Sequence, residues 1–285
     1  MRGRTGAVAR SSRRLDLVHS PYAVFASLWH NRRLVWQLTR REVLGRYRGS
    51  LLGLTWSFFH PLLMLGIYTL VFGYIFHARW GNEVNSTADF AIVLFAGLIV
   101  FGIFSEAINR APSLLLTHPT YVKKVVFPLE CLPWVPLGAA LFHAGVSLLV
   151  LLIANAAVRG TLPWTLVFVP VVLLPLLLLS IGCAWLLTSL GVYVRDVGQA
   201  VSVFTTVLLF LSPVFYPASS LPESLRMVLA VNPLATVIEQ SRAVLLSGSP
   251  PSWAPLAWCY AVSVPVACLG LLWFDRTRAG FADVL

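Results

Sequence analysis

A long uncharged segment is the feature of this sequence that most restricts how the chain can fold. Residues 51–76 contain no Asp, Glu, Lys or Arg, and they directly follow a basic stretch at 38–50, here called the collar. A helix of about 26 residues is roughly 39 Å long, which exceeds the ~30 Å hydrocarbon core of a bilayer. The segment therefore predicts a membrane-spanning helix that begins at a basic collar.

The composition agrees with a membrane protein. Hydrophobic residues make up 58% of the 285 residues and charged residues 11%, whereas charged residues approach a quarter of an ordinary soluble domain. The net charge of +10 is unevenly placed, because arginines crowd the residues before Leu51. Such a bias indicates cytosolic loops facing an anionic leaflet rather than a nucleic-acid surface, so no nucleic-acid partner is expected.

The apolar segments predict an all-α, multi-pass protein with six transmembrane helices. The predicted spans are 51–76, 89–108, 135–158, 165–194, 200–215 and 255–274. Most Lys and Arg residues then fall on the side that holds both termini, which predicts that both termini are cytosolic. Residues 1–20 are rich in Arg and Ser without periodicity and are expected to form a flexible cytosolic tail, with one transmembrane domain over 21–285.

Three further helical segments are expected outside the spans. Residues 21–48 predict an interfacial helix with Trp29 and Trp36 at headgroup depth; a soluble helix that packs on a partner is the alternative. Residues 225–231 and 234–246 are too short to cross the bilayer, so we expect two re-entrant helices in the outer leaflet. A peripheral loop over 218–253 is the alternative to that arrangement.

The sequence offers no catalytic or metal-binding constellation. The four cysteines are scattered without CxxC spacing, and His143, inside an apolar span, reads as a helix-packing residue. Glu106 is the nearest candidate for an intramembrane carboxylate, and it has no paired acid, so ion-coupled transport is poorly supported. No GxxxxGK[ST] motif occurs, so a separate ATPase would have to bind ATP and Mg²⁺ if transport is ATP-driven.

Several motifs appear in an order that resembles a known family. They are Arg40-Arg41-Glu42, Arg46-Tyr47-Arg48-Gly49-Ser50, Leu52-Gly53-x-x-Trp56, His60-Pro61, Asn109-Arg110, His118-Pro119, Val122-Lys123-Lys124-Val125-x-Phe127-Pro128-x-Glu130, Arg195-Asp196, Leu211-Ser212-Pro213-Val214-Phe215-Tyr216-Pro217, Asn232-Pro233-Leu234 and Phe281-Ala282-Asp283. Over residues 30–285 the chain resembles the ABC-2 type permeases that export O-antigen, capsule or teichoic acid. It departs from that pattern at Leu129, where a basic residue is expected, and over residues 1–20.

The resemblance implies a homodimeric permease that works with two ATP-binding cassette subunits in the bacterial inner membrane. The implied substrate is an undecaprenyl-pyrophosphate-linked polysaccharide, with the O-antigen of lipopolysaccharide as the first expectation. The permease itself would bind no cofactor, because ATP and Mg²⁺ would sit on the partner ATPase.

The expected sites fall into three groups. The ATPase-coupling residues are Tyr121, Val122, Lys123, Lys124, Val125, Phe127, Arg195 and Asp196; a solvated basic loop is the alternative. The outer-gate residues are Ser212, Pro213, Tyr216, Asn232, Glu239 and Arg242. The substrate entrance would use Arg40, Arg41, Arg46 and Arg48, at the depth of the pyrophosphate.

Other functions remain open at this level. The entrance arginines could equally anchor phospholipid, which demands the same charges. Rival classes are an ABC exporter of drugs or small lipids, a membrane-embedded glycosyltransferase or polymerase, and a stand-alone channel. An exporter of drugs or small lipids would lack the collar and the Leu52-Gly53-x-x-Trp56 motif. A glycosyltransferase or polymerase would need acidic pairs or Arg-rich outer loops.

Overall fold

The computed structural model describes residues 28–75, 87–118, 120–121, 127–160 and 162–284. The predictions that concern residues 1–20 and Val122, Lys123, Lys124 and Val125 lie outside the described residues.

The described chain is helical from end to end and contains no strand. Its principal helices are α3 (Arg32–Arg46), α4 (Trp56–Tyr68), α5 (Thr87–Arg110), α7 (Trp134–Arg159), α8 (Val169–Tyr193), α9 (Val197–Leu211), α10 (Glu223–Val231), α11 (Pro233–Arg242), α12 (Trp253–Thr277) and α13 (Phe281–Val284). Short 3₁₀ or π segments extend several of them, namely Gly53–Thr55, Thr69–Ile75, Ala111–Ser113, Leu129–Cys131, Trp164–Phe168, Ala218–Ser220, Ala243–Ser247 and Arg278–Gly280.

Among the described residues, five helical segments are long and apolar enough to cross a membrane: Gly53–Phe72, Ala88–Ser113, Leu129–Arg159, Trp164–Tyr193 and Trp253–Val284. The all-α multi-pass architecture is therefore confirmed. Of the six predicted spans, the fifth is α9, whose 15 residues extend about 22 Å and fall short of a full crossing. The count of six is thus not confirmed by helix length.

Helix α5 forms the centre of the bundle. Residues buried inside the molecule make up 72% of its most apolar stretch, against 11% for the span that contains α4. Helices α7, α8, α9 and α11 all pack against α5. A lipid-facing helix needs no buried face, so the difference indicates that α4 lies at the periphery and that α5 is enclosed by protein.

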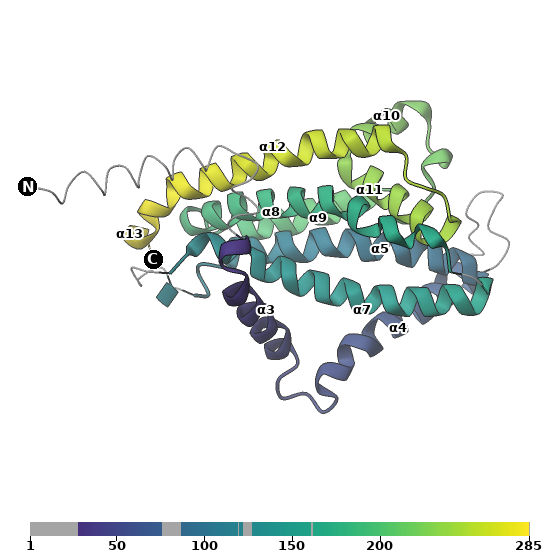
Figure 1. The fold of residues 1–285 in the computed structure, drawn as a ribbon, viewed down its shortest axis with the longest axis horizontal. Helices are drawn as coiled ribbons and strands as arrows, with labels where there is room; N and C mark the ends of the chain where they lie inside the picture. The colour runs from purple at the N-terminus through teal and green to yellow at the C-terminus, as the bar shows by residue number, and fades with distance from the viewer. Residues whose placement is uncertain (1–27, 76–86, 119, 122–126, 161, 285) are drawn as a thin grey trace, which may run out of the picture.

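The bundle has two unlike ends, which lie at opposite ends of its long axis (Figure 1). One, here called the basic end, carries the C-terminal end of α5, the Leu129–Cys131 turn and α13; Arg278 pairs there with Glu130. The other, the α11 end, carries α10 and α11, and Arg159 at the end of α7 pairs there with Asp89 of α5. Successive long helices run between these two ends, as expected of a polytopic membrane protein.

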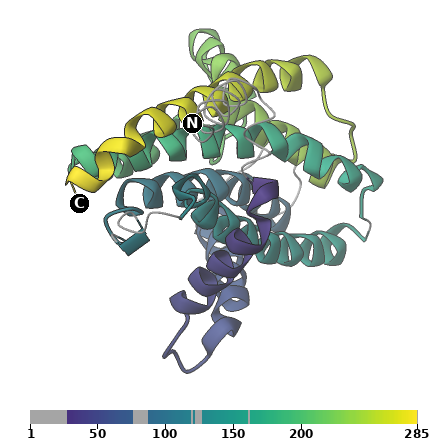
Figure 2. The ribbon, with the colours of Figure 1, turned by 60° about the vertical axis from the view of Figure 1, so that its left-hand side comes forward.

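Helices α3 and α4 project from the bundle as a V whose tip is residues 47–55 (Figure 1 and Figure 2). Gly49 and Gly53 turn the chain there with φ of 86° and 52°, values that favour glycine because it lacks a Cβ. Helix α3 packs on α7 through Val35, Thr39 and Val43. Trp36, one of the two tryptophans expected at headgroup depth, is exposed.

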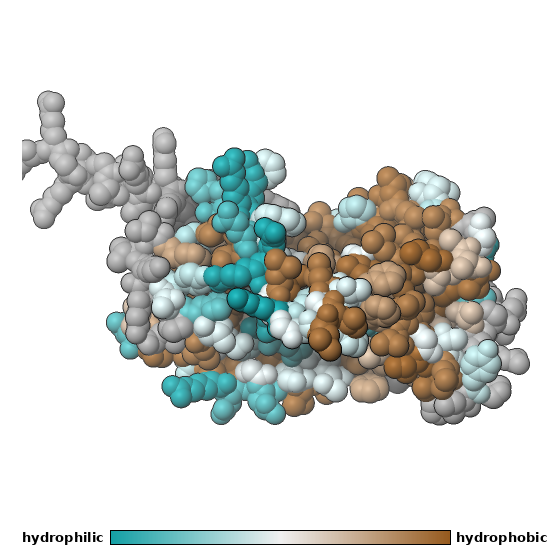
Figure 3. Space-filling view, turned by 90° about the horizontal axis from the view of Figure 1, so that it is seen from below, coloured by the Kyte–Doolittle hydropathy of each residue, from teal (hydrophilic) through white to brown (hydrophobic). Residues whose placement is uncertain are grey.

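The surface seen from the side of the V divides into a polar and an apolar region. Hydrophilic side chains gather over the half nearer the basic end, and hydrophobic side chains cover the half nearer the α11 end (Figure 3). Exposed apolar residues on α4 and α7 include Leu62, Leu63, Ile67, Leu149 and Ile153. An exposed apolar surface of this kind is stable in lipid, whereas in water it would promote association.

The two short helices expected between the fifth and sixth segments are present as α10 and α11. Asn232 caps α11, because its side-chain oxygen accepts a hydrogen bond from the Leu234 amide, and Pro233 occupies the first turn. Residues Leu234–Ile238 are buried against α5, α8 and α12. Helix α11 is therefore an interior element of the bundle rather than a peripheral loop.

Candidate functional site

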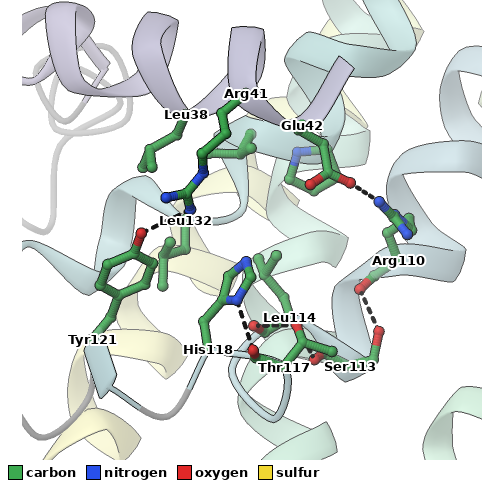
Figure 4. A pocket seen from close by; sticks show the side chains of 12 residues that line it. Leu38, Arg41, Glu42, Arg110, Ser113, Leu114, Thr117, His118, Tyr121 and Leu132 are labelled. Carbon is green, nitrogen blue, oxygen red and sulfur yellow. Dashed lines mark hydrogen bonds and ion pairs between the residues drawn. The ribbon is translucent and has the colours of Figure 1, made fainter. Parts of the chain in front are cut away.

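The collar lies against the loop that follows α5. Arg41 donates to the hydroxyl of Tyr121 at 2.8 Å, and Glu42 forms an ion pair with Arg110 (Figure 4). These contacts border a cavity of about 240 Å³ that Leu38, His118 and other residues of the same elements line. The collar and the expected ATPase-coupling region are thus joined at the basic end.

A second contact fastens the collar to the interior of the bundle. At the end of α3, Arg46 donates through Nη2 to Oε1 of Glu106 on α5. Nδ1 of His143 on α7 lies 3.1 Å from both carboxylate oxygens, and Nη1 of Arg46 lies 3.3 Å from the same nitrogen. Three helices therefore contribute one ionisable side chain each to a single cluster, here called the charged cluster.

The charged cluster faces a cavity of about 490 Å³ between the V and the bundle. Its lining is mostly polar or amphipathic, formed by Arg46, Tyr47, Ser50, Trp56, Ser57, His60, Pro61, Glu106, His143 and Ser147. The ring of Tyr47 meets that of His143 edge to face, with centroids 6.1 Å apart. Partial burial raises the pKa of the Tyr47 phenol, so this residue remains a neutral hydrogen-bonding group near pH 7.

The entrance arginines are divided between different environments. Arg41 and Arg46 are engaged with Tyr121 and Glu106, whereas Arg40 and Arg48 are exposed on α3 and the turn after it. The four residues therefore do not form one patch of equivalent charges, although all lie on the collar.

The described coupling residues lie at the basic end. Tyr121 and Phe127 stack on each other with centroids 4.4 Å apart, and both pack against the chain's own core. These two aromatic residues therefore already cover part of their apolar surface within the chain. Arg195 and Asp196 form an exposed turn between α8 and α9.

Arg242 ties the outer-gate residues together. It is 8% exposed and donates to the carbonyl oxygens of Val93 on α5 at 2.9 Å, Val214 at 2.8 Å and Pro213. Gly97 on α5 lies against the guanidinium, where a Cβ atom would collide with it. One buried side chain on α11 thus holds the central helix and the end of α9.

The other gate residues are placed around that junction, with one difference in burial. Asn232 lies 3.5 Å from the buried Ser212 hydroxyl, and Tyr216 donates to the carbonyl of Phe210 at 2.7 Å. Burial raises the pKa of the Tyr216 phenol. Glu239 lies one turn before Arg242 on α11 and is exposed, so it does not share the buried setting of that arginine.

The charged cluster is the feature that sequence reasoning missed. Glu106 and His143 were each visible as isolated ionisable residues in apolar segments, and Arg46 as a collar cation. Ionisable groups inside membrane segments usually pair with one another, so the shared depth of Glu106 and His143 was the available signal. Over the described residues no group of three or more His, Cys, Asp or Glu side chains has the proximity that a metal site requires.

The described helices form a bundle with a peripheral V, a polar collar and an internal pair of short helices, which is the architecture of a multi-pass membrane protein. The comparison with known families makes the class specific: residues 33–246 match the ABC-2 type transporter family. The chain therefore belongs to that family, as the motifs from the collar onward indicated.

Similar proteins extend over nearly the whole chain. The O-antigen export system permease protein RfbA of Myxococcus xanthus is 30% identical over 258 residues, covering 90% of this chain and 96% of its own length. The protein of the same name from Klebsiella pneumoniae is 22% identical and covers 87% and 93%. The polysialic acid transport protein KpsM of Escherichia coli is 25% identical and covers 84% and 90%.

Proposed function

We propose that this chain is the membrane permease of an ATP-driven exporter that moves an undecaprenyl-pyrophosphate-linked polysaccharide, the O-antigen of lipopolysaccharide, across the inner membrane. The observation that carries this proposal is the similarity to the Myxococcus O-antigen permease along 90% of the chain. A capsular polymer is the second candidate, because the polysialic acid transport protein also matches over most of the chain.

The energy for export would come from two ATP-binding cassette subunits bound to a homodimer of this chain. ATP and Mg²⁺ belong to those subunits, because the permease sequence has no phosphate-binding loop. The basic end would face the cytosol under the positive-inside rule, so Tyr121, Phe127 and the Arg195-Asp196 turn would be accessible to an ATPase.

The substrate would enter beside the V. Arg40 and Arg48 are exposed and suit the phosphates of lipids or of the arriving carrier, while Arg46 sits deeper, at the 490 Å³ cavity. The α11 end would then form the outer gate, with Arg242 holding α11 against α5 and α9 until the path opens.

Deletion of the gene from its native host tests the proposal. We expect the O-antigen ladder to disappear from lipopolysaccharide gels, lipid-linked polymer to accumulate inside the cell, and a plasmid copy to restore the ladder. Loss of an extractable capsule with an intact ladder would support the second candidate. Unchanged amounts of both surface polymers would overturn polysaccharide export as the function.

A further inference from the structure

One ring nitrogen of His143 in the charged cluster, Nε2, can accept a proton. Because a carboxylate only accepts hydrogen bonds, the proton between His143 and Glu106 belongs to Nδ1 of the imidazole. Nε2 of His143 is buried and makes no hydrogen bond within the part of the chain that the structure describes. A neutral His143 therefore keeps an acceptor nitrogen to which a second proton can add.

Glu106 requires a positive partner in this position. It lies in the span Ala88–Ser113, where an unpaired carboxylate is costly. Arg46 supplies the partner from α3, outside the spans, and its side chain is 38% exposed. An anion that reaches the cavity meets this guanidinium, and taking it would leave Glu106 with His143 alone.

We propose that Arg46, Glu106 and His143 form an anion-exchange site, in which the anionic group of the ligand takes Arg46 from Glu106 while His143 gains a proton. That the anion is the pyrophosphate of a polyprenyl carrier rests on the proposed function. The guanidinium exchanges its hydrogen bond to Oε1 of Glu106 for one to a phosphate oxygen. One proton from water adds to Nε2 of His143, and the resulting imidazolium becomes the partner of Glu106.

Few other groups at the cavity could take up the proton in place of His143. Besides the cluster itself, the titratable groups that face the cavity are Tyr47, from the end of α3, and His60 from α4. A tyrosine is neutral in both states near pH 7, which leaves His60 as the competing proton acceptor. The cavity also offers the hydroxyls of Ser50, Ser57 and Ser147 to a bound phosphate.

Proton uptake makes anion binding depend on pH. Linkage requires that a ligand whose binding adds a proton binds more tightly as the pH falls, and that protonation and binding assist each other equally. Glu106 weakens binding by competing for Arg46, which favours release of the substrate after it has moved. When His143 takes up a proton, the imidazolium pairs with Glu106, and Glu106 then competes less strongly with the ligand for Arg46.

Calorimetry on the full chain in phosphatidylcholine nanodiscs tests the exchange. The probe is polyprenyl-pyrophosphoryl-N-acetylglucosamine, whose two phosphate groups each keep one negative charge across the pH range used. We expect the wild type to bind at least about tenfold more tightly at about pH 6 than at about pH 8, because binding takes up a proton. Titrations in buffers of different ionisation enthalpy should show the uptake of about one proton for each ligand bound.

Two variants separate the roles of the cluster. Glu106→Gln removes the competitor and the need for a proton, so binding should be tight at both pH values. His143→Gln should bind weakly at both, because no imidazolium forms. Glu42→Gln, which removes a carboxylate paired with Arg110 elsewhere on the collar, should keep the wild-type dependence, and so should His60→Gln.

The outcomes discriminate between the exchange site and the proposed function. Wild-type pH dependence in both Glu106→Gln and His143→Gln overturns the exchange site, as does its loss in His60→Gln. Probe binding by the wild type that is equal at both pH values overturns the exchange site alone. Failure of the wild type to bind the probe at either pH overturns both this site and the lipid-linked substrate.

Discussion

At the scale of single residues, lysine replaces arginine without loss only where the guanidinium acts as a point charge. Arg48 is exposed, whereas Arg46 donates to Glu106 next to His143. We expect Arg48→Lys to export normally and Arg46→Lys to export about tenfold less, because an ammonium cannot reproduce the planar, directional contact of the guanidinium with the Glu106 carboxylate. The amount of surface polysaccharide, measured at matched protein levels, distinguishes the two variants. Wild-type export by both would leave these arginines only an anchoring role.

Arg242 provides a second test at this scale. Its guanidinium donates to carbonyl groups on α5 and at the end of α9, and the residue is buried. Arg242→Met should cost about 3 kcal/mol or more, because several buried acceptors lose a charged donor. The guanidinium of the exposed Arg226, which donates to the carbonyl oxygens of Ser219 and Leu221, supplies the control, and Arg226→Met should change stability by less than about 1 kcal/mol.

Thermal unfolding of the purified full chain, followed by intrinsic fluorescence, measures both arginine variants. Equal shifts for Arg242→Met and Arg226→Met would show that the buried contacts of α11 contribute no more than a surface arginine does.

At the scale of helices, the most extensive contact among the described helices is between α8 and α12. A Cβ on Gly182 would collide with the backbone of Val266 and Ala267, whereas a Cβ on Gly145 of α7 meets nothing within 4 Å. Gly145→Ala should therefore stabilise the chain by about 0.5–1 kcal/mol through helix propensity, and Gly182→Ala should destabilise it by about 2 kcal/mol or more. The midpoints of thermal unfolding of both variants and the wild type, measured in one detergent, show whether each substitution stabilises or destabilises the chain. Stabilisation by Gly182→Ala would contradict the close contact between α8 and α12.

The positions of the helices were largely readable from the sequence. Uncharged runs with few helix breakers locate the long helices to within a few residues, because a bilayer demands length and apolarity together. The first predicted span, 51–76, begins two residues late at Gly53, since Gly49 and Gly53 turn the tip of the V. Helix α9 is shorter than a span because Ser212 and Pro213 end it, and no composition rule distinguishes a short apolar helix from a crossing one.

The partners within the candidate site were not readable in the same way. Arg46, Glu106 and His143 are separated by 60 and 37 residues along the chain, so only the packing of α3, α5 and α7 brings them together. The face of α3 that packs on the bundle was not readable either. Val35 and Val43 are buried while Trp36 is exposed, because burial depends on the direction from which α7 approaches.

At the scale of the whole molecule, the collar contacts both the segment that follows α5 and the interior of the bundle. Arg41 contacts Tyr121, Glu42 pairs with Arg110 at the end of α5, and one turn further on Arg46 pairs with Glu106. Under the proposed function, a movement of the Tyr121 segment would be transmitted along this one helix to the cavity. Packed side chains and rigid helices are the elements through which distant sites can be coupled.

Because of this connection, a loop that cannot engage the ATPase should leave the permease uncoupled. Val122 and Val125 flank the two lysines of the loop, and a carboxylate at either position would oppose burial in a partner's groove. We expect the double variant Val122→Asp, Val125→Asp to lower export by at least about tenfold while the ATPase still hydrolyses ATP, because a coupling free energy of a few kcal/mol is lost. Export and ATP hydrolysis are measured together in membranes that contain the whole complex.

The matched control places the same charge elsewhere at the basic end. Val284 on α13 is 51% exposed, so Val284→Asp should leave export and hydrolysis unchanged. Tyr121→Phe removes only the hydroxyl that Arg41 reaches and should lower export by a smaller factor, because the Glu42–Arg110 pair remains. If the double aspartate variant exports at the wild-type rate, the loop does not carry the coupling, and the contacts of the collar with it serve only to hold α3 in place.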